Sequence, residues 1–105
     1  MWNTIDVIDT GKMERTRSIF TSDYGPRTLD ISPDGKTLAV VCDTVGSINR
    51  SVNFIDIASS RVTEKRVIRE SSNLRDVVYT PDGQYVAVTY ETPKNWLPVC
   101  EAENG

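Results

Sequence analysis

The sequence predicts an all-β fold of repeated antiparallel strands, for three reasons. A ten-residue stretch, residues 31–40 (ISPDGKTLAV), returns as residues 79–88 (YTPDGQYVAV), with Gly83 placed 48 positions (83 − 35) after Gly35. Short runs rich in Val, Ile and Thr alternate with clusters of Gly, Pro, Asn, Asp and Ser, which is the composition of strands and turns. Apolar residues at helical spacing never continue for more than two turns.

Each copy of the repeated stretch is expected to form a β-hairpin. Proline fixes φ at the second position of a tight turn, aspartate bonds the neighbouring backbone, and glycine adopts the positive φ that closes the turn. Both copies carry these residues in this order, at residues 33–35 and 81–83. An Asp beside a Gly also occurs in calcium and phosphate loops, but those sites need more oxygen ligands or a glycine-rich turn that opens a helix. We therefore expect both stretches to be structural turns.

The repeat extends beyond the hairpins. Residues 5–9 (IDVID) match residues 52–56 (VNFID), apolar to apolar and polar to polar. Residues 1–90 are therefore expected to hold the repeats, whereas residues 91–105 are expected to form a long loop or tail. Four strand-like runs in each repeat of this length are typical of β-propeller blades. The expected strands are residues 4–9, 15–20, 26–32, 36–42, 51–57, 62–68, 74–80 and 84–90.

The composition limits the chemistry that this chain can carry. With 105 residues and a formal charge of −3, the chain has the size of one small domain and no basic patch for nucleic acid. It has no histidine, which excludes Ser-His-Asp and Cys-His nucleophile pairs, histidine-ligated zinc and a histidine ligand to haem. Cys42 and Cys100 are too few for a zinc cage; they form one disulfide or remain structural or free thiols. We expect no cofactor, no metal and no stretch that spans a membrane.

The repeated residues resemble those of a known family. Residues 25–40 read Gly-Pro-Arg-x-Leu-x-Ile-Ser-Pro-Asp-Gly-Lys-x-Leu-Ala-Val, and an apolar strand, Val-x-Phe-Ile-Asp, follows at residues 52–56. This pattern resembles the YVTN-type β-propeller repeat, a WD40-like repeat of lactonase-like, surface-layer and cytochrome cd-type nitrite reductase propellers. The resemblance covers residues 1–90. It predicts the fold of the chain but not its function, because proteins that share a fold can catalyse different reactions or none.

If the family's strand order holds, the chain enters and leaves in the middle of blades. Residues 26–32 and 36–42 would be the inner strands of one complete four-stranded blade, and residues 51–57 and 62–68 its outer strands. An outer pair would precede this blade and an inner pair would follow it, giving two blades' worth of strands. Because propellers use roughly 4 to 8 blades to remove open edges, the resemblance implies an incomplete ring. Self-association, or blades missing from this chain, would be needed to close the ring.

The resemblance also places candidate binding residues near one mouth of the ring. Arg27 and Arg75 take matching places just before the innermost strands, where two guanidinium groups can bind a carboxylate or phosphate. Asp76 is an available partner for Arg75, so a salt bridge between blades or a solvated rim is the alternative. Asp30 and Asp76 are also considered as a catalytic acid and base. Such a pair needs two carboxyl groups at a controlled separation, which the sequence does not show. No catalytic residue is assigned.

The last segment departs most from the repeat and adds a fourth binding candidate, Trp96. Its counterpart, residues 43–50, joins two strands directly, whereas residues 91–105 are longer and rich in proline. Long loops on rigid frameworks often carry recognition, and a tryptophan among prolines suits contact with a protein or peptide. The alternative is that Trp96 caps the sheet beneath it.

Two functional hypotheses follow. The favoured one is a non-catalytic fragment of a larger propeller, whose exposed loop face includes residues 43–50 and binds a protein or a small ligand through Arg27, Arg75, Asp76 and Trp96. The alternative is part of a propeller enzyme or electron-transfer protein, lactonase-like or nitrite-reductase-like, with its active site in blades outside this chain. The family resemblance favours a periplasmic or extracellular location, although the chain shows no signal peptide. Nucleic acid and membrane are not expected partners.

Overall fold

The chain folds into strands joined by turns and short connections. The computed structural model describes residues 2–43, 50–68, 73–92 and 95–104. None of these residues lies in a helix, and so none lies in a helix long and apolar enough to cross a membrane. The expected all-β class is therefore confirmed. The strands formed by the described residues are β1 (Thr4–Asp9), β2 (Glu14–Phe20), β3 (Pro26–Ile31), β4 (Thr37–Cys42), β5 (Ser51–Asp56), β6 (Arg61–Val67), β7 (Asn73–Tyr79), β8 (Tyr85–Thr92) and β9 (Asn95–Asn104).

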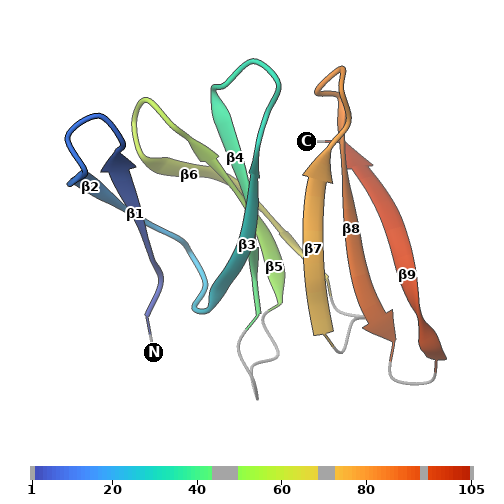
Figure 1. Cartoon of the computed structure of the whole chain (residues 1–105). Helices are drawn as coiled ribbons and strands as arrows, with labels where there is room; N and C mark the ends of the chain where they lie inside the picture. The colour runs from blue at the N-terminus through green and yellow to red at the C-terminus, as the bar shows by residue number, and fades with distance from the viewer. Residues whose placement is uncertain (1, 44–49, 69–72, 93–94, 105) are drawn as a thin grey trace.

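The strands form three antiparallel sheets that stand side by side, as Figure 1 shows. Sheet A contains β1 and β2, sheet B contains the strands β3-β4-β5-β6 in that order, and sheet C contains β7-β8-β9. Each strand pairs with the next one along the chain, so every pair within a sheet is a simple antiparallel neighbour. The described residues form sheets of two to four strands and no closed ring.

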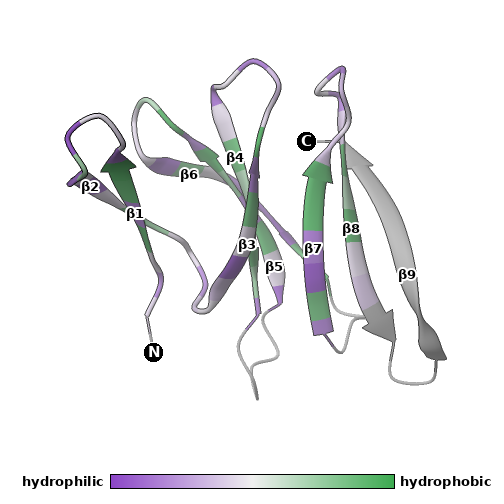
Figure 2. Cartoon of the chain, in the orientation of Figure 1, coloured by the Kyte–Doolittle hydropathy of each residue, from purple (hydrophilic) through white to green (hydrophobic). Residues whose placement is uncertain are grey.

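Sheet B lies at the centre because both of its faces are covered. Successive side chains of a strand point to opposite faces, and β4 is buried without interruption from Leu38 to Cys42. The strongly apolar sequence of β4 is what a strand between two covered faces requires. In Figure 2, by contrast, hydrophobic and hydrophilic residues alternate along β7. The face toward sheet C contributes Ala39, Val41, Val52 and Phe54 to one cluster. The face toward sheet A contributes Leu38, Val40, Cys42 and Ile55 to another, together with Ile19 of β2.

The two repeated hairpin turns have the same geometry. Gly35 and Gly83 both adopt a positive φ, of 75° and 74°. In the first turn the Asp34 carboxylate accepts hydrogen bonds from the Ser32 hydroxyl (2.6 Å) and the Lys36 amide (3.0 Å), which lower the pKa of this carboxyl group. The turns also touch, because a Cβ on Gly83 would lie 3.4 Å from the Pro33 ring. Both stretches are therefore structural turns, and they lie together at one end of sheets B and C.

Replacing Gly35 by alanine is expected to destabilise the chain by about 1–2 kcal/mol, because an L-residue is strained at positive φ. No atom lies within 4 Å of a Cβ added at this glycine, so backbone strain is the cause. Urea unfolding followed by circular dichroism measures the change. Gly11→Ala is the matched control, because Gly11 does not have a positive φ and a Cβ there would have one close neighbour, Oδ1 of Asp9 at 3.3 Å. Equal losses from both variants would contradict the prediction.

The expected loop at residues 91–105 is not what the structure contains. Strand β8 continues to Thr92, and β9 pairs with it from Asn95 to Asn104, with a register shift between Tyr90 and Thr92. Among the described strands β9 is at the edge of sheet C, where a residue without an amide donor breaks no ladder, so the strand tolerates Pro98. Sheet C therefore contains three strands, whereas the sequence predicted only two there, residues 74–80 and 84–90.

Candidate functional site

A groove between sheets A and B contains one of the predicted binding residues, Arg27. The groove has a volume of about 210 Å³. Thr4 and Ile5 of β1 form one side, and the start of β3, from Pro26 to Leu29, forms the other. Within the described residues, β1 pairs only with β2 and β3 pairs only with β4, so each of these strands has one unpaired edge. Unpaired strand edges are ready-made surfaces for pairing with another strand.

The apolar residues of β3 beside this groove are exposed, although their repeat counterparts are buried. Leu29 is 44% exposed, whereas Val77, at the same place in the repeat, is 3% exposed. Val77 packs on sheet B, because sheet C covers that face. The two strands of sheet A pack on the opposite face of sheet B, but they do not cover the apolar side chains of β3. The groove is thus an incompletely covered sheet face with an arginine at its rim.

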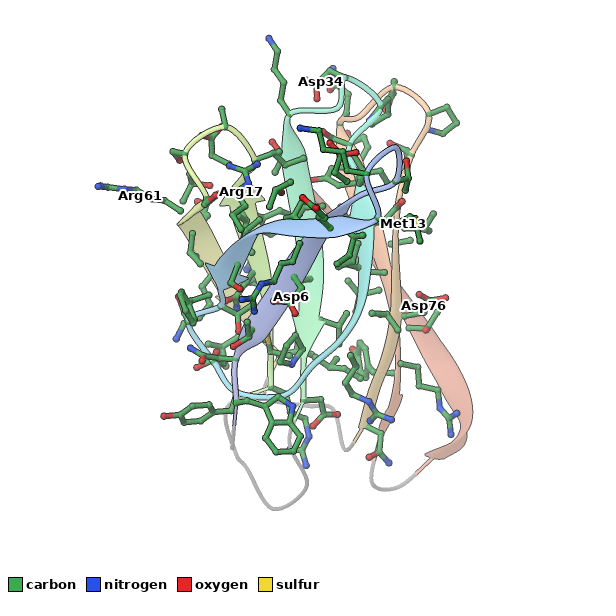
Figure 3. The ribbon with its side chains drawn as sticks, turned by 60° about the vertical axis from the view of Figure 1, so that its left-hand side comes forward. Asp6, Met13, Arg17, Asp34, Arg61 and Asp76 are labelled. Atoms are coloured by element: carbon green, nitrogen blue, oxygen red, sulfur yellow. The ribbon has the colours of Figure 1, made fainter. Side chains whose placement is uncertain are left out.

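The structure brings β3 and β7 together, and with them two of the predicted residues. The Thr28 hydroxyl donates a hydrogen bond to the carbonyl oxygen of Arg75 (3.5 Å), so Arg27 and Arg75 lie on adjacent strands. Both side chains are exposed. Asp76 is also exposed, and its Oδ1 accepts a hydrogen bond from the Val77 amide (2.9 Å). Figure 3 labels Asp76 at the side of the molecule.

Trp96, the fourth predicted residue, lies in β9 and not in a loop. Because the order of sheet C is β7-β8-β9, strand β8 separates it from Arg75 and Asp76 on β7. The side chain of Trp96 lies outside the described part of the structure. Of the three predicted residues whose side chains the structure describes, Arg27 lines the groove between sheets A and B, and Arg75 and Asp76 do not.

Asp30, which was considered as an acid or base, instead connects two sheets. Its Oδ1 accepts a hydrogen bond from the Ile31 amide (2.9 Å), and its Oδ2 accepts one from the Tyr79 amide (2.8 Å). Both oxygens thus bind the backbone, one on β3 and the other on β7. This carboxylate satisfies two edge-strand amides that would otherwise have no partner in the sheet.

Sequence reasoning missed a buried polar network around Asn53. Asn53 is fully buried; its Oδ1 accepts a hydrogen bond from the Ser22 amide (2.6 Å), and its Nδ2 donates one to the Ser51 hydroxyl (3.0 Å). Ser51 in turn donates to Asp23, whose other oxygen lies 3.5 Å from the Lys65 ammonium. The network holds the connection between β2 and β3 against sheet B. A polar residue between apolar neighbours in a strand is typical of a solvent-facing position, so no local signal marked Asn53 as buried.

A second polar contact joins sheets B and C. Asp43 is buried; its Oδ2 accepts a hydrogen bond from the Leu74 amide (2.7 Å), and its Oδ1 lies 3.2 Å from Nε of Arg50. That Nε is not aligned for a hydrogen bond with any group, so its contact with Asp43 is an ion pair. The segment 43–50 was expected to lie on an exposed loop face. For Asp43 this is wrong, and residues 44–49 lie outside the described part.

Cys42 is a free thiol buried between sheets A and B. Burial raises its pKa to about 11, because the interior disfavours the thiolate; the nearby Asp23 charge adds to the effect, while a hydrogen bond with Thr21 opposes it. The thiolate is the nucleophile, so this cysteine is unreactive at neutral pH. The side chain of Cys100 lies outside the described residues.

Cys42 is expected to resist alkylation at pH 8 and to react at the rate of a model thiol once urea unfolds the chain. Iodoacetamide labelling of a Cys100→Ser variant, followed by mass spectrometry, measures both rates. Because the folded pKa lies above the unfolded one, the protonated thiol stabilises the fold below pH 9, and this contribution is lost as the pH rises toward 11. Fast labelling of the native chain at pH 8 would contradict the prediction.

Comparisons with known proteins identify a close relative. No family model matches the chain. The chain is 80% identical over 105 residues to hydrazine synthase subunit beta of Kuenenia stuttgartiensis, and it covers 27% of that protein. A solved structure of Kuenenia stuttgartiensis hydrazine synthase matches with a TM-score of 0.84 and 79% identity, over 96% of this chain and 29% of that chain. The chain therefore spans less than a third of the proteins that it matches.

These matches correct two expectations. The resemblance to YVTN-type or WD40-like propeller repeats is wrong: no family model matches, and both matched proteins are hydrazine synthase. The pattern misled because proline, aspartate and glycine produce the same tight turn in unrelated proteins. The expectation of a non-catalytic binding segment is overturned by the same relative, because that protein is a subunit of a synthase. The alternative, part of an enzyme, agrees better with this finding.

Proposed function

We propose that this chain is part of the beta subunit of a hydrazine synthase. The observation that carries the proposal is the 80% identity to that subunit along the whole chain. The structural agreement, with a TM-score of 0.84, supports the same assignment. The reacting groups come from other parts of the subunit or complex. In support, the sequence has no histidine, and the described residues contain no group of three or more Cys, Asp or Glu side chains that could hold a metal ion.

Within the subunit, the three sheets are successive units of a larger array, and other segments of the protein cover their open faces. The groove beside β3 is the place for one such segment. Its occupant is a two-stranded hairpin that pairs with the edge of β1 and covers Leu29 and Ile31, as β7 and β8 cover the opposite face of sheet B. Exposed apolar residues beside an unpaired edge support this arrangement.

The predicted binding residues serve contacts with protein partners. Arg27 stands at the groove, and Arg75 and Asp76 lie on the neighbouring β7, all on exposed positions. Arginine is enriched among the residues that dominate the energy of protein interfaces. Trp96, on β9, belongs to a separate contact at the far edge of sheet C. The relative is itself named as one subunit of a synthase, which supports protein partners.

A segment exchange tests the proposed function. The corresponding part of the Kuenenia stuttgartiensis beta subunit is replaced by this chain, and the chimeric subunit is purified with the rest of the complex. We expect the chimera to assemble and to support hydrazine formation. A soluble chimera that fails to join the complex, or a complex with no hydrazine formation, would overturn the proposal.

The groove is tested in the same chimera with Leu29→Glu. A charge at this place is expected to prevent the covering segment from packing, and to reduce the yield of folded subunit. Met13→Glu is the control, because Met13 is exposed in the turn between β1 and β2 and does not line the groove. Figure 3 labels Met13. Equal yields from both variants would show that the groove is not covered.

A further inference from the structure

The outer strands of sheets A and B lie next to each other and carry an excess of positive charge. Within the described residues, β2 pairs only with β1 and β6 pairs only with β5, so both are edge strands. They are neighbours, because Val62 of β6 packs against the apolar cluster that contains Ile19 of β2. The basic residues of these two strands, which together we call the outer rim, are Arg15, Arg17, Arg61, Lys65 and Arg66.

The outer rim is positive although the whole chain has a formal charge of −3. Five of the 12 lysine and arginine residues of the chain are on β2 and β6, and the acidic residues there are Glu14 and Glu64. All five basic side chains are exposed. The sequence did not reveal this patch, because the two strands are far apart along the chain and only the packing of the sheets brings them together.

Two arginines of the outer rim have no partner within the described part of the chain. Arg17 forms no ion pair or hydrogen bond with another described residue. Arg61 is also without one: Asp56, which lies opposite it in the ladder, accepts a hydrogen bond from the Ser59 amide (2.9 Å) instead. Figure 3 labels Arg17 and Arg61 on the same side of the molecule. Both guanidinium groups are therefore available to a partner.

The choice of residue distinguishes a binding surface from a merely solvated edge. Charged side chains on an edge strand can serve to keep other strands away, and lysine is the residue most used for that purpose. The outer rim has four arginines and one lysine, and that lysine, Lys65, lies 3.5 Å from the Asp23 carboxylate. Arginine is enriched at protein interfaces and lysine is depleted. A guanidinium group also binds a carboxylate through two parallel hydrogen bonds, so the composition favours an acidic partner.

We propose that the outer rim binds an acidic surface of another subunit of the complex, with one carboxylate on Arg17 and another on Arg61. This inference rests on the proposed function, because it takes the partner from the same complex. A small anion is a poorer match, since it would meet single exposed arginines, whose ion pairs are weak. The unpaired backbone groups of both edge strands favour a protein chain over a nucleic acid.

The test uses the chimeric beta subunit of the segment exchange, with Arg17→Glu and Arg61→Glu introduced together. The affinity of the purified subunit for the rest of the complex is measured at about 0.02 M and about 0.15 M salt. We expect the double variant to bind about tenfold more weakly at low salt, and the difference to shrink at the higher salt, because salt screens exposed charges. Poly-glutamate in excess is expected to compete with the complex for the unsubstituted subunit.

Lys36→Glu is the matched control, because it makes the same change of charge at an exposed position in the turn between β3 and β4. Far-UV circular dichroism checks that each variant is folded. Equal affinities of the double variant and of Lys36→Glu would overturn the inference, and so would competition by a DNA duplex but not by poly-glutamate. If the unsubstituted chimera itself failed to join the complex, the proposed function would fall and the inference with it, so the two failures are distinguishable.

Discussion

Replacing Asp43 by alanine is expected to lower the free energy of unfolding by about 3–5 kcal/mol. The change removes the carboxylate that forms an ion pair with Arg50. It also leaves the buried Leu74 amide without its hydrogen-bond acceptor. Removing one member of a buried ion pair costs this much because the remaining charge stays in a poorly solvated place. Asp43→Asn is expected to cost less, since an amide oxygen can still accept from Leu74. Urea unfolding at neutral pH measures both variants.

Asp6→Ala is the matched control for Asp43. Asp6 also pairs with an arginine, Arg15, at 4.0 Å, but both side chains are largely exposed. Exposed ion pairs contribute about 0–1 kcal/mol, because water screens the charges and two long side chains lose freedom. Figure 3 labels Asp6 on the outer sheet. A loss for Asp43→Ala no larger than that for Asp6→Ala would contradict the role of Asp43 between sheets B and C.

Replacing Phe54 by alanine is expected to cost about 3–5 kcal/mol, the range for a large buried aromatic side chain. Phe54 is 6% exposed and belongs to the cluster between sheets B and C, with Val77 and Tyr79 of β7. The lost ring leaves a cavity between two sheets, and the backbone of paired strands limits how far the cavity can collapse. Calorimetric or urea unfolding measures the loss, with an unchanged m-value as the sign of two-state behaviour.

Phe20→Ala controls for the aromatic ring itself. Phe20 is 60% exposed at the end of β2, so its truncation is expected to change stability by about 0.5 kcal/mol or less. If the two phenylalanines gave equal losses, sheet C would not pack on sheet B as described. The same measurement also tests whether the three sheets unfold together.

Local sequence rules were sufficient for most strands. The expected ranges 26–32, 36–42, 51–57 and 62–68 agree closely with β3 to β6, because a proline-aspartate-glycine turn and an alternating apolar pattern act within a few residues. The same rules failed for β9, where prolines argued for a loop. An edge strand tolerates proline, and sequence alone does not tell which strand is at an edge.

The candidate sites were less predictable than the strands. Arg27 was named from its place before a strand, and the structure puts it at a groove. Asp43 and Asn53 were not named, because their importance comes from partners 31 positions away in the chain, Leu74 and Ser22. The family resemblance supplied a misleading function, since it rested on turn chemistry that many proteins share.

The sequence by itself determined the all-β class, the repeat and the two hairpin turns, since each depends on backbone preferences within a few neighbouring residues. Only the tertiary structure decided what each repeated position does. Leu29 and Val77 hold the same place in the repeat, yet Val77 is covered by sheet B and Leu29 faces the groove. Burial depends on which sheet packs against a face, and that packing joins segments far apart in the chain, where local patterns carry no information.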